Sequence, residues 1–456
     1  MSSFSLKQMR ELFLTKQLSP SEVVEDYLAR IEKHRDANIY ITVNAAQARH
    51  QAALATQRYH LGEASGLLEG IPVAYKDNIF VRGLPNTAGS SIEKSFIPDQ
   101  DAPAVSRMQQ AGAINLGKLN LHEYAFGITS QNPFYGAVEN PWNRRFSPGG
   151  SSGGSGAALA ADLAMMTLGT DTGGSIRIPA AACGVIGLKA TRDVISAQGT
   201  RPIAASLDHV GPLTKTVEDM ALGLEVLTGQ DYLTHLVRSL KGLRIGVPTN
   251  YFWHQVDAHV GAAYERALQQ LQALGAVLIE VEVPYTEADA GVVFALAICE
   301  GAAEHTERMA QYRDQYGADV LAALSAAENF TAVDYIKAKE RQVELTQQFE
   351  YLLQDIDVLA IPTTPVTAQE IGVNELEIAG QKQDLFGLIV HNCAPFSVTG
   401  HPALSLPCGL GAHSIPIGLQ LVAAHHRERV VLQVAYAYEQ EYLADFYAQR
   451  MQVAFS

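Results

Sequence analysis

The clearest candidates for chemistry in this sequence are serine and lysine residues that lie in or near glycine clusters. One cluster spans residues 147–156 and reads Ser-Pro-Gly-Gly-Ser-Ser-Gly-Gly-Ser-Gly, with Ser151 at its centre. Glycine at this density lets the backbone approach itself or a ligand closely, and a turn that enters a helix can bind phosphate. The segment has neither the lysine of a P-loop nor the Gly-x-Gly-x-x-Gly spacing of dinucleotide sites. Taken alone, it is open between a structural turn, a phosphate site and a catalytic loop.

The second cluster places Ser175 directly after two glycines. Residues 168–179 read Leu-Gly-Thr-Asp-Thr-Gly-Gly-Ser-Ile-Arg-Ile-Pro, and a strand-like stretch from Met165 leads into them. A serine after such a turn can expose its hydroxyl while nearby amide N–H groups point at one spot, which is a geometry that binds an oxyanion. A lone serine in a glycine turn is more commonly structural, so this segment alone does not decide between the two.

Lys76 lies at the end of a short apolar strand predicted for Ile71 to Tyr75. A buried lysine loses affinity for its proton and can serve as a base near neutral pH. The ordinary alternative for a lysine at a strand end is a solvated surface residue.

The remaining sequence predicts strands that alternate with helices, which indicates an α/β layered fold. Ser19, Pro20 and Glu22 form the capping pattern of a helix start. The stretch from about 285 to 355 is almost wholly helical and is expected to form a lobe on the main sheet. Further elements are predicted as helices at 44–59, 105–112, 260–274, 330–353 and 427–442, and as strands at 113–116, 243–247, 277–281, 358–362, 403–407 and 417–422.

The composition suits a globular protein with a large core, because 47% of the 456 residues are hydrophobic and 18% are charged. The net charge of −15 disfavours a nucleic-acid phosphate or an anionic membrane as the partner. The start of the chain has no apolar signal segment, so we expect a cytoplasmic location. Neither the four cysteines nor the histidines, among them His122, His209, His391 and His401, have metal-ligand spacing, and we expect no metal and no cofactor.

Together, the two glycine clusters and the strand-end lysine resemble the amidase signature family. Gly-Gly-Ser-Ser-Gly-Gly-Ser-Gly-Ala-Ala at 149–158 and Gly-Thr-Asp-Thr-Gly-Gly-Ser-Ile-Arg at 169–177 are specific in combination. Further similar stretches lie at 112–120, 140–142, 184–189 and 206–212. The resemblance implies a single amidase domain over residues 1–456 with a signature core at about 70–225. Its fold would be a mixed central β-sheet covered by helices on both faces.

The resemblance also implies a serine-dependent amide hydrolase with a Ser-Ser-Lys triad. Ser175 would be the nucleophile, Ser151 would pass the proton, and neutral Lys76 would accept it. A cis peptide bond is expected between Gly150 and Ser151. The oxyanion hole would be the backbone N–H groups of Thr172, Gly173, Gly174 and Ser175, and the supporting residues would be Asp171, Arg177 and Gly150.

The substrate is predicted less directly than the triad. The resemblance places Phe126, Gly127, Thr129, Ser130 and Phe396 at the substrate, and with Phe134 and Tyr135 they suggest an apolar cleft. This favours small to medium amides or anilides, with esters and carbamates (urethanes) as further candidates. The expected working form is a monomer or homodimer. Residues 190–194 depart from the family pattern, so the connection to Ser206 is expected either to differ in shape or to be mobile.

Two other functions compete with this interpretation. The first is the glutaminase (A) subunit of a tRNA-dependent amidotransferase, which belongs to the same family and works in a complex. Residues 303–348 lack the basic, tyrosine-rich character of that subunit near its partner interface, which disfavours it. The second is a nucleotide- or phosphate-binding protein, which the missing P-loop lysine disfavours.

Overall fold

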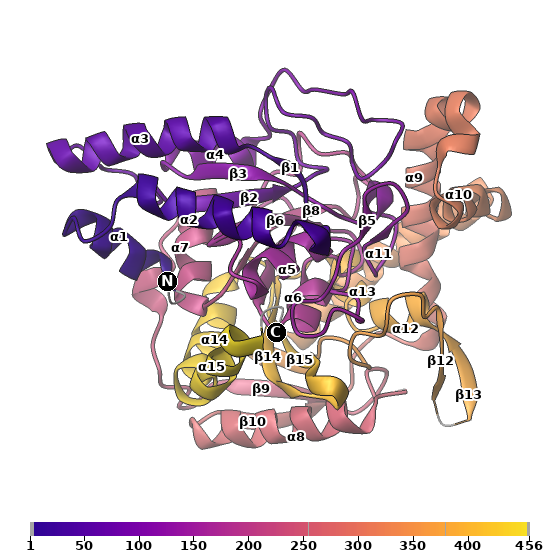
Figure 1. Cartoon of the computed structure of the whole chain (residues 1–456). Helices are drawn as coiled ribbons and strands as arrows, with labels where there is room; N and C mark the ends of the chain where they lie inside the picture. Colours follow the sequence, from indigo (N-terminus) through magenta and orange to yellow (C-terminus); the bar gives the residue numbers. More distant parts are fainter. Residues whose placement is uncertain (1–3, 254, 379, 454–456) are drawn as a thin grey trace.

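The computed structural model describes residues 4–253, 255–378 and 380–453. In this described part, eleven strands form one mixed sheet in the order β1-β3-β2-β6-β8-β7-β14-β15-β11-β9-β10 (Figure 1). The strands are β1 (Tyr40–Val43), β2 (Pro72–Lys76), β3 (Ile114–Leu119), β6 (Met166–Asp171), β7 (Ile186–Lys189), β8 (His209–Thr214), β9 (Arg244–Pro248), β10 (Val277–Val281), β11 (Val358–Pro362), β14 (Ala403–Leu410) and β15 (Pro416–Val422).

Helices surround this sheet, as the α/β prediction requires. They are α1 (Leu6–Leu14), α2 (Pro20–Lys33), α3 (Ala45–Leu61), α4 (Pro103–Gln110), α5 (Gly153–Ala160), α6 (Arg177–Cys183), α7 (Val217–Thr228), α8 (Ala258–Ala273), α9 (Ala290–Tyr312), α10 (Ala318–Ser325), α11 (Ala332–Leu352), α12 (Leu385–Val390), α13 (Ala394–Thr399), α14 (Glu428–Tyr442) and α15 (Ala444–Val453). Two small hairpins pair β4 (Gln131–Asn132) with β5 (Gly136–Ala137) and β12 (Glu375–Ile378) with β13 (Gln381–Asp384).

Local sequence signals explain where many of these elements begin. At α2 the Ser19 hydroxyl accepts the Glu22 N–H, the Glu22 carboxylate accepts the Ser19 N–H, and Pro20 occupies the first turn. This capping box satisfies backbone donors that have no partner within the helix. Every residue of β2, β6 and β8 is buried, as expected for strands covered on both faces.

The pairing of β2 with β6 brings two of the predicted chemical segments together. These strands are parallel neighbours, with Val73 opposite Met166 and Tyr75 opposite Leu168. The carboxyl ends of parallel strands meet at the same edge of a sheet, where α/β proteins commonly place their sites. Lys76 ends β2, and Ser175 follows β6, so both lie at that edge.

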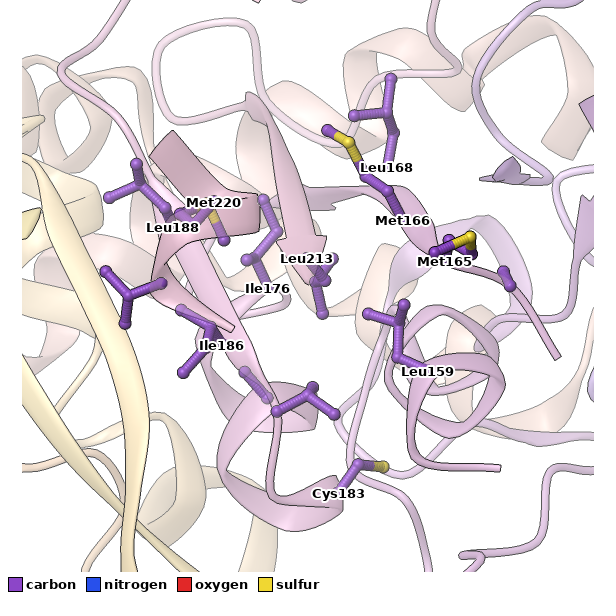
Figure 2. Packing of buried hydrophobic residues seen from close by; sticks show 14 of the residues in the cluster. Leu159, Met165, Met166, Leu168, Ile176, Cys183, Ile186, Leu188, Leu213 and Met220 are labelled. Carbon is purple, nitrogen blue, oxygen red and sulfur yellow. The ribbon is translucent and has the colours of Figure 1, made fainter. Parts of the chain in front are cut away.

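A dense apolar core lies behind this edge. Figure 2 shows part of it, with Leu159 from α5, Met166 and Leu168 from β6, Leu188 from β7 and Leu213 from β8. Close packing of this kind transmits strain and resists changes in side-chain volume. The core therefore fixes the strands from which the loops of the site emerge.

The helical lobe predicted at 285–355 is present as α9, α10 and α11. α9 packs on both α10 and α11, and Figure 1 shows α9 and α10 at the right of the view. Among the described helices, none is both long and apolar enough to cross a membrane. The single domain over residues 1–456 and the cytoplasmic location stay predictions.

Candidate active site

Lys76 is fully buried and hydrogen-bonded to two hydroxyl groups. Its Nζ donates to Ser151 Oγ and to Thr170 Oγ1, each at 2.7 Å. Burial lowers the pKa of Lys76 to about 7, against the opposing charges of Asp171 and Asp208. Near neutral pH a large fraction of Lys76 is therefore the free amine, which is able to take up a proton.

Ser151 is held beside both Lys76 and the Ser175 turn. The peptide bond between Gly150 and Ser151 is cis, as expected. The Ser151 carbonyl accepts hydrogen bonds from Ser130 Oγ at 3.1 Å and from the His122 N–H at 3.2 Å. The next residue, Ser152, donates its N–H to the Ser175 carbonyl at 3.3 Å. The structure thus brings the segments of all three predicted triad residues together.

A glycine position explains the shape of the turn before Ser175. Gly174 has φ of +132°, a conformation essentially reserved for glycine. A β-carbon there would lie 2.7 Å from both Cys393 Cβ and Ile178 Cδ1. At Gly173, by contrast, the nearest neighbour of such a carbon would be Val293 Cγ2 at 4.0 Å.

One of the four predicted oxyanion donors has another partner. The Gly174 N–H donates to Asp171 Oδ1 at 2.8 Å, so it is not open to a substrate oxygen. The inclusion of Gly174 in the oxyanion hole is corrected accordingly. The N–H groups of Thr172, Gly173 and Ser175 remain as the proposed donors, and all three residues line the adjoining cavity.

Asp171 and Arg177 form a fully buried, two-point ion pair. Arg177 Nε and Nη2 lie 3.0 and 2.9 Å from Asp171 Oδ2 and Oδ1. Burial alone would raise the pKa of Asp171, but the Arg177 guanidinium outweighs it and holds that pKa below its usual range. Because Asp171 also accepts the Gly174 and Ile176 N–H groups, the pair fixes the turn around Ser175. The supporting role expected for both residues stays a prediction.

A cavity of about 260 Å³ opens at Ser175. Apart from the turn at 172–175, its lining is apolar and contains no charged side chain. Of the predicted substrate residues, Phe126 and Gly127 lie in this lining. The larger share of the wall was not predicted from the sequence. It comes from α9 (Val293, Phe294, Ala297, Ile298), from α12 (Phe386, Val390), and from Ile128, Ile203 and Ala323.

The other predicted substrate residues lie elsewhere. Phe396 is fully buried, as is every residue of α13, and its ring stacks on that of Phe252. Ser130 is fully buried and supports the Ser151 loop. Thr129 lies at a separate, smaller cavity. Phe134 and Tyr135 are also outside the wall; their N–H groups bind Asn132, and Phe134 is exposed.

Residues 190–194, which depart from the family pattern, are held in place by hydrogen bonds. The Arg192 guanidinium donates to the carbonyls of Ser397 and Val398 at 2.7 and 2.8 Å. The Thr191 N–H donates to Glu428 at 2.8 Å. This connection is therefore tied to α13 and α14.

One group of potential metal ligands exists among the described residues. Glu350, His401 and His425 place ligand atoms within 4.8 Å of one another. The two imidazole rings are stacked, with centroids 4.1 Å apart and planes 8° from parallel. One nitrogen of each ring faces the same Glu350 oxygen: His401 Nε2 and His425 Nδ1 lie 3.0 and 2.8 Å from Oε1. The arrangement suits a structural contact between α11 and the sheet.

The geometry defines a class of enzyme. A buried amine able to accept a proton, a serine bonded to it, and a second serine in a glycine turn at an apolar cavity are parts that acyl transfer can use. The comparison with known proteins agrees: the Amidase family model matches residues 22–432. The chain belongs to the Amidase family and is an enzyme that hydrolyses the carbon–nitrogen bonds of amides.

Individual relatives cover nearly the whole chain. The A subunit of glutamyl-tRNA(Gln) amidotransferase from Halothermothrix orenii is 35% identical over 96% of both chains. The solved structure of the A subunit of the same amidotransferase from Thermotoga maritima is 28% identical, with a TM-score of 0.79 over 96% of this chain and 94% of that one. A structure from a vestigial complex that reveals the origins of an s-triazine catabolic enzyme is 31% identical, with a TM-score of 0.92 over 96% and 98%.

These relatives correct the main functional prediction from the sequence. The prediction favoured general amides and anilides, with carbamates as candidates, over the amidotransferase subunit. This ranking was wrong, because the curated relatives that match across 96% of the chain carry the name of the amidotransferase subunit. An apolar lining and the composition of residues 303–348 do not specify which amide reacts, so they are weaker guides to function than similarity over nearly the whole chain.

The two glycines before Ser175 provide a matched pair of variants. We expect Gly174→Ala to lose at least about tenfold in the rate at which a fluorophosphonate labels Ser175, because the new β-carbon meets Cys393 and Ile178. Gly173→Ala is the control, since its β-carbon meets nothing closer than 4.0 Å. Equal labelling rates for the two folded variants would contradict this account of the turn.

The buried amine predicts a pH dependence. Because Lys76 must be neutral to accept a proton, the labelling rate at Ser175 should rise with pH through the Lys76 pKa of about 7. The rate constant is measured from about pH 5.5 to about pH 9 with the intact chain. A rate that falls as pH rises through this range is the opposite of what a neutral-lysine base requires.

Proposed function

We propose that this chain is the glutaminase subunit of a tRNA-dependent amidotransferase, which hydrolyses the side-chain amide of glutamine and supplies ammonia for transfer. The observation that carries the proposal is the 35% identity to the A subunit of glutamyl-tRNA(Gln) amidotransferase over 96% of both chains. Ser175 lines the cavity, and its carbonyl accepts the N–H of Ser152, the residue after the serine that binds Lys76. This arrangement supports the chemistry that such a subunit needs.

In the proposed reaction, Ser175 Oγ attacks the carboxamide carbon while its proton passes through Ser151 to neutral Lys76. The negative charge that develops on the amide oxygen is stabilised by the N–H groups of Thr172, Gly173 and Ser175. Ser151 then returns a proton to the departing nitrogen, the carbon–nitrogen bond breaks, and ammonia leaves. Water hydrolyses the resulting ester on Ser175 by the same proton route, which releases glutamate and restores the serine.

The cavity wall supports a dependence on partner subunits. Free glutamine carries an α-ammonium and an α-carboxylate, and a charged group buried without a partner is costly. The lining residues contain no charged side chain, so these groups would have to lie at the mouth of the cavity. We propose that partner chains complete that mouth. The net charge of −15 likewise favours partner chains as the main contact with tRNA phosphates.

The test is ammonia release from glutamine by the purified chain, alone and with the other amidotransferase subunits and glutamyl-tRNA. We expect at least about a tenfold rise in kcat/KM on addition of the partners, and no release by Ser175→Ala in the same complex. An acetanilide-type substrate serves as the comparison. If that substrate is cleaved faster than glutamine when all the partners are present, the proposal is overturned.

A further inference from the structure

Asp208 connects two walls of the cavity from a position directly before β8. Its Oδ1 accepts a hydrogen bond from the Thr172 hydroxyl at 2.5 Å. Its Oδ2 accepts the N–H groups of Ile203 and Ala204 at 2.8 and 3.1 Å. Thr172 belongs to the turn that carries the oxyanion donors, and both Thr172 and Ile203 line the cavity.

We propose that Asp208 is a positioning residue for amide hydrolysis, which ties the oxyanion turn to the Ile203 wall and places a negative charge that acts on Lys76. The inference rests on the proposed role of Lys76 as the base. The Asp208 carboxylate would set the spacing between the Thr172 turn and the Ile203 wall, and its charge would act on Lys76, the proposed proton acceptor.

The geometric half of this role follows from the contacts. A carboxylate has two oxygen atoms, and here each one serves a different loop. Loss of the side chain would leave the Ile203 and Ala204 N–H groups and the Thr172 hydroxyl without their partner. Unsatisfied polar groups in a largely buried site are costly, so the two loops would be expected to separate or rearrange.

The electrostatic half follows from the charges near Lys76. Two carboxylates act on it, those of Asp171 and Asp208. The charge of Asp171 is largely offset by its two-point pair with Arg177, whereas Asp208 is hydrogen-bonded to a hydroxyl and two backbone N–H groups. Burial raises the pKa of Asp208 to about 6, and its hydrogen bonds and the charge of Lys76 oppose that rise. Its negative charge favours protonated Lys76 and so raises the pKa of Lys76.

The decisive variant is Asp208→Asn, which removes the charge and keeps the shape. Its amide oxygen can still face the two N–H groups, while its NH2 group faces the Thr172 hydroxyl. We expect the pH profile of fluorophosphonate labelling at Ser175 to move to lower pH, so that the ratio of the rates at about pH 6 and pH 8 rises about threefold, equal to about half a pKa unit. Asp208→Ala, which also removes both ties, should lose at least about tenfold at about pH 8.

Two further measurements keep the test independent of activity and of general destabilisation. The ¹³Cε resonance of Lys76, assigned with Lys76→Met, should titrate at lower pH in Asp208→Asn than in the natural chain. Asp219→Asn is the control. Like Asp208, Asp219 accepts a backbone N–H, that of Leu6 at 2.8 Å, and has its pKa raised by burial to about 6. It belongs to α7, which packs on β7 and β8 and contributes no residue to the cavity lining. Asp219→Asn should leave the profile unmoved.

The outcomes separate this inference from the proposed function. An Asp208→Asn protein whose labelling profile and Lys76 titration both match the natural chain would overturn the role of Asp208. If Lys76→Met is labelled as fast as the natural chain, the role of Lys76 as the base fails instead. In that case the ¹³C titration still decides whether Asp208 acts on Lys76.

Discussion

The buried ion pair between Asp171 and Arg177 is the contact on which the geometry of the site depends. It joins the end of β6 to the start of α6, and Arg177 also donates to Gln420 on β15 and to Ser397 on α13. Removing one partner of such a pair typically costs about 3–5 kcal/mol, because the other charge is left buried and uncompensated. The pair therefore couples the turn that carries Ser175 to distant parts of the chain. Gly174, with its positive φ, is held by two hydrogen bonds: its N–H donates to Asp171, and its carbonyl accepts the Ile178 N–H.

Burial of Lys76 is the second constraint, and it has a chemical rather than a structural consequence. A lysine in water would hold its proton at neutral pH and could not act as a base. Here Lys76 is fully buried at the end of β2, which is paired with β3 and β6, and the hydroxyl groups of Ser151 and Thr170 satisfy the amine in either protonation state. The fold thus produces a base from a residue that is ordinarily a cation.

Much of this site could be predicted from the sequence, because its signals are local. In the site, the strand that ends at Lys76 is evident from a few adjacent residues. Elsewhere in the fold, the same is true of the capping box at Ser19. The cavity wall is not, since it is assembled from α9 and α12, far along the chain from Ser175. Phe396 illustrates the difficulty: every residue of its short helix is buried, so burial alone cannot say whether a ring faces the core or a cleft. The preference for anilides failed for a related reason, because apolar residues near the motifs were interpreted as substrate contacts.

The measurement that tests the central claim most directly is peptide mapping of the fluorophosphonate adduct in the natural chain and in Lys76→Met and Ser151→Ala. If Ser175 is activated through Ser151 by neutral Lys76, the adduct lies on Ser175 in the natural chain, and both variants, while still folded, lose at least about a hundredfold in labelling rate. An adduct found solely on another residue, or undiminished labelling of Ser175 in both variants, would contradict the account.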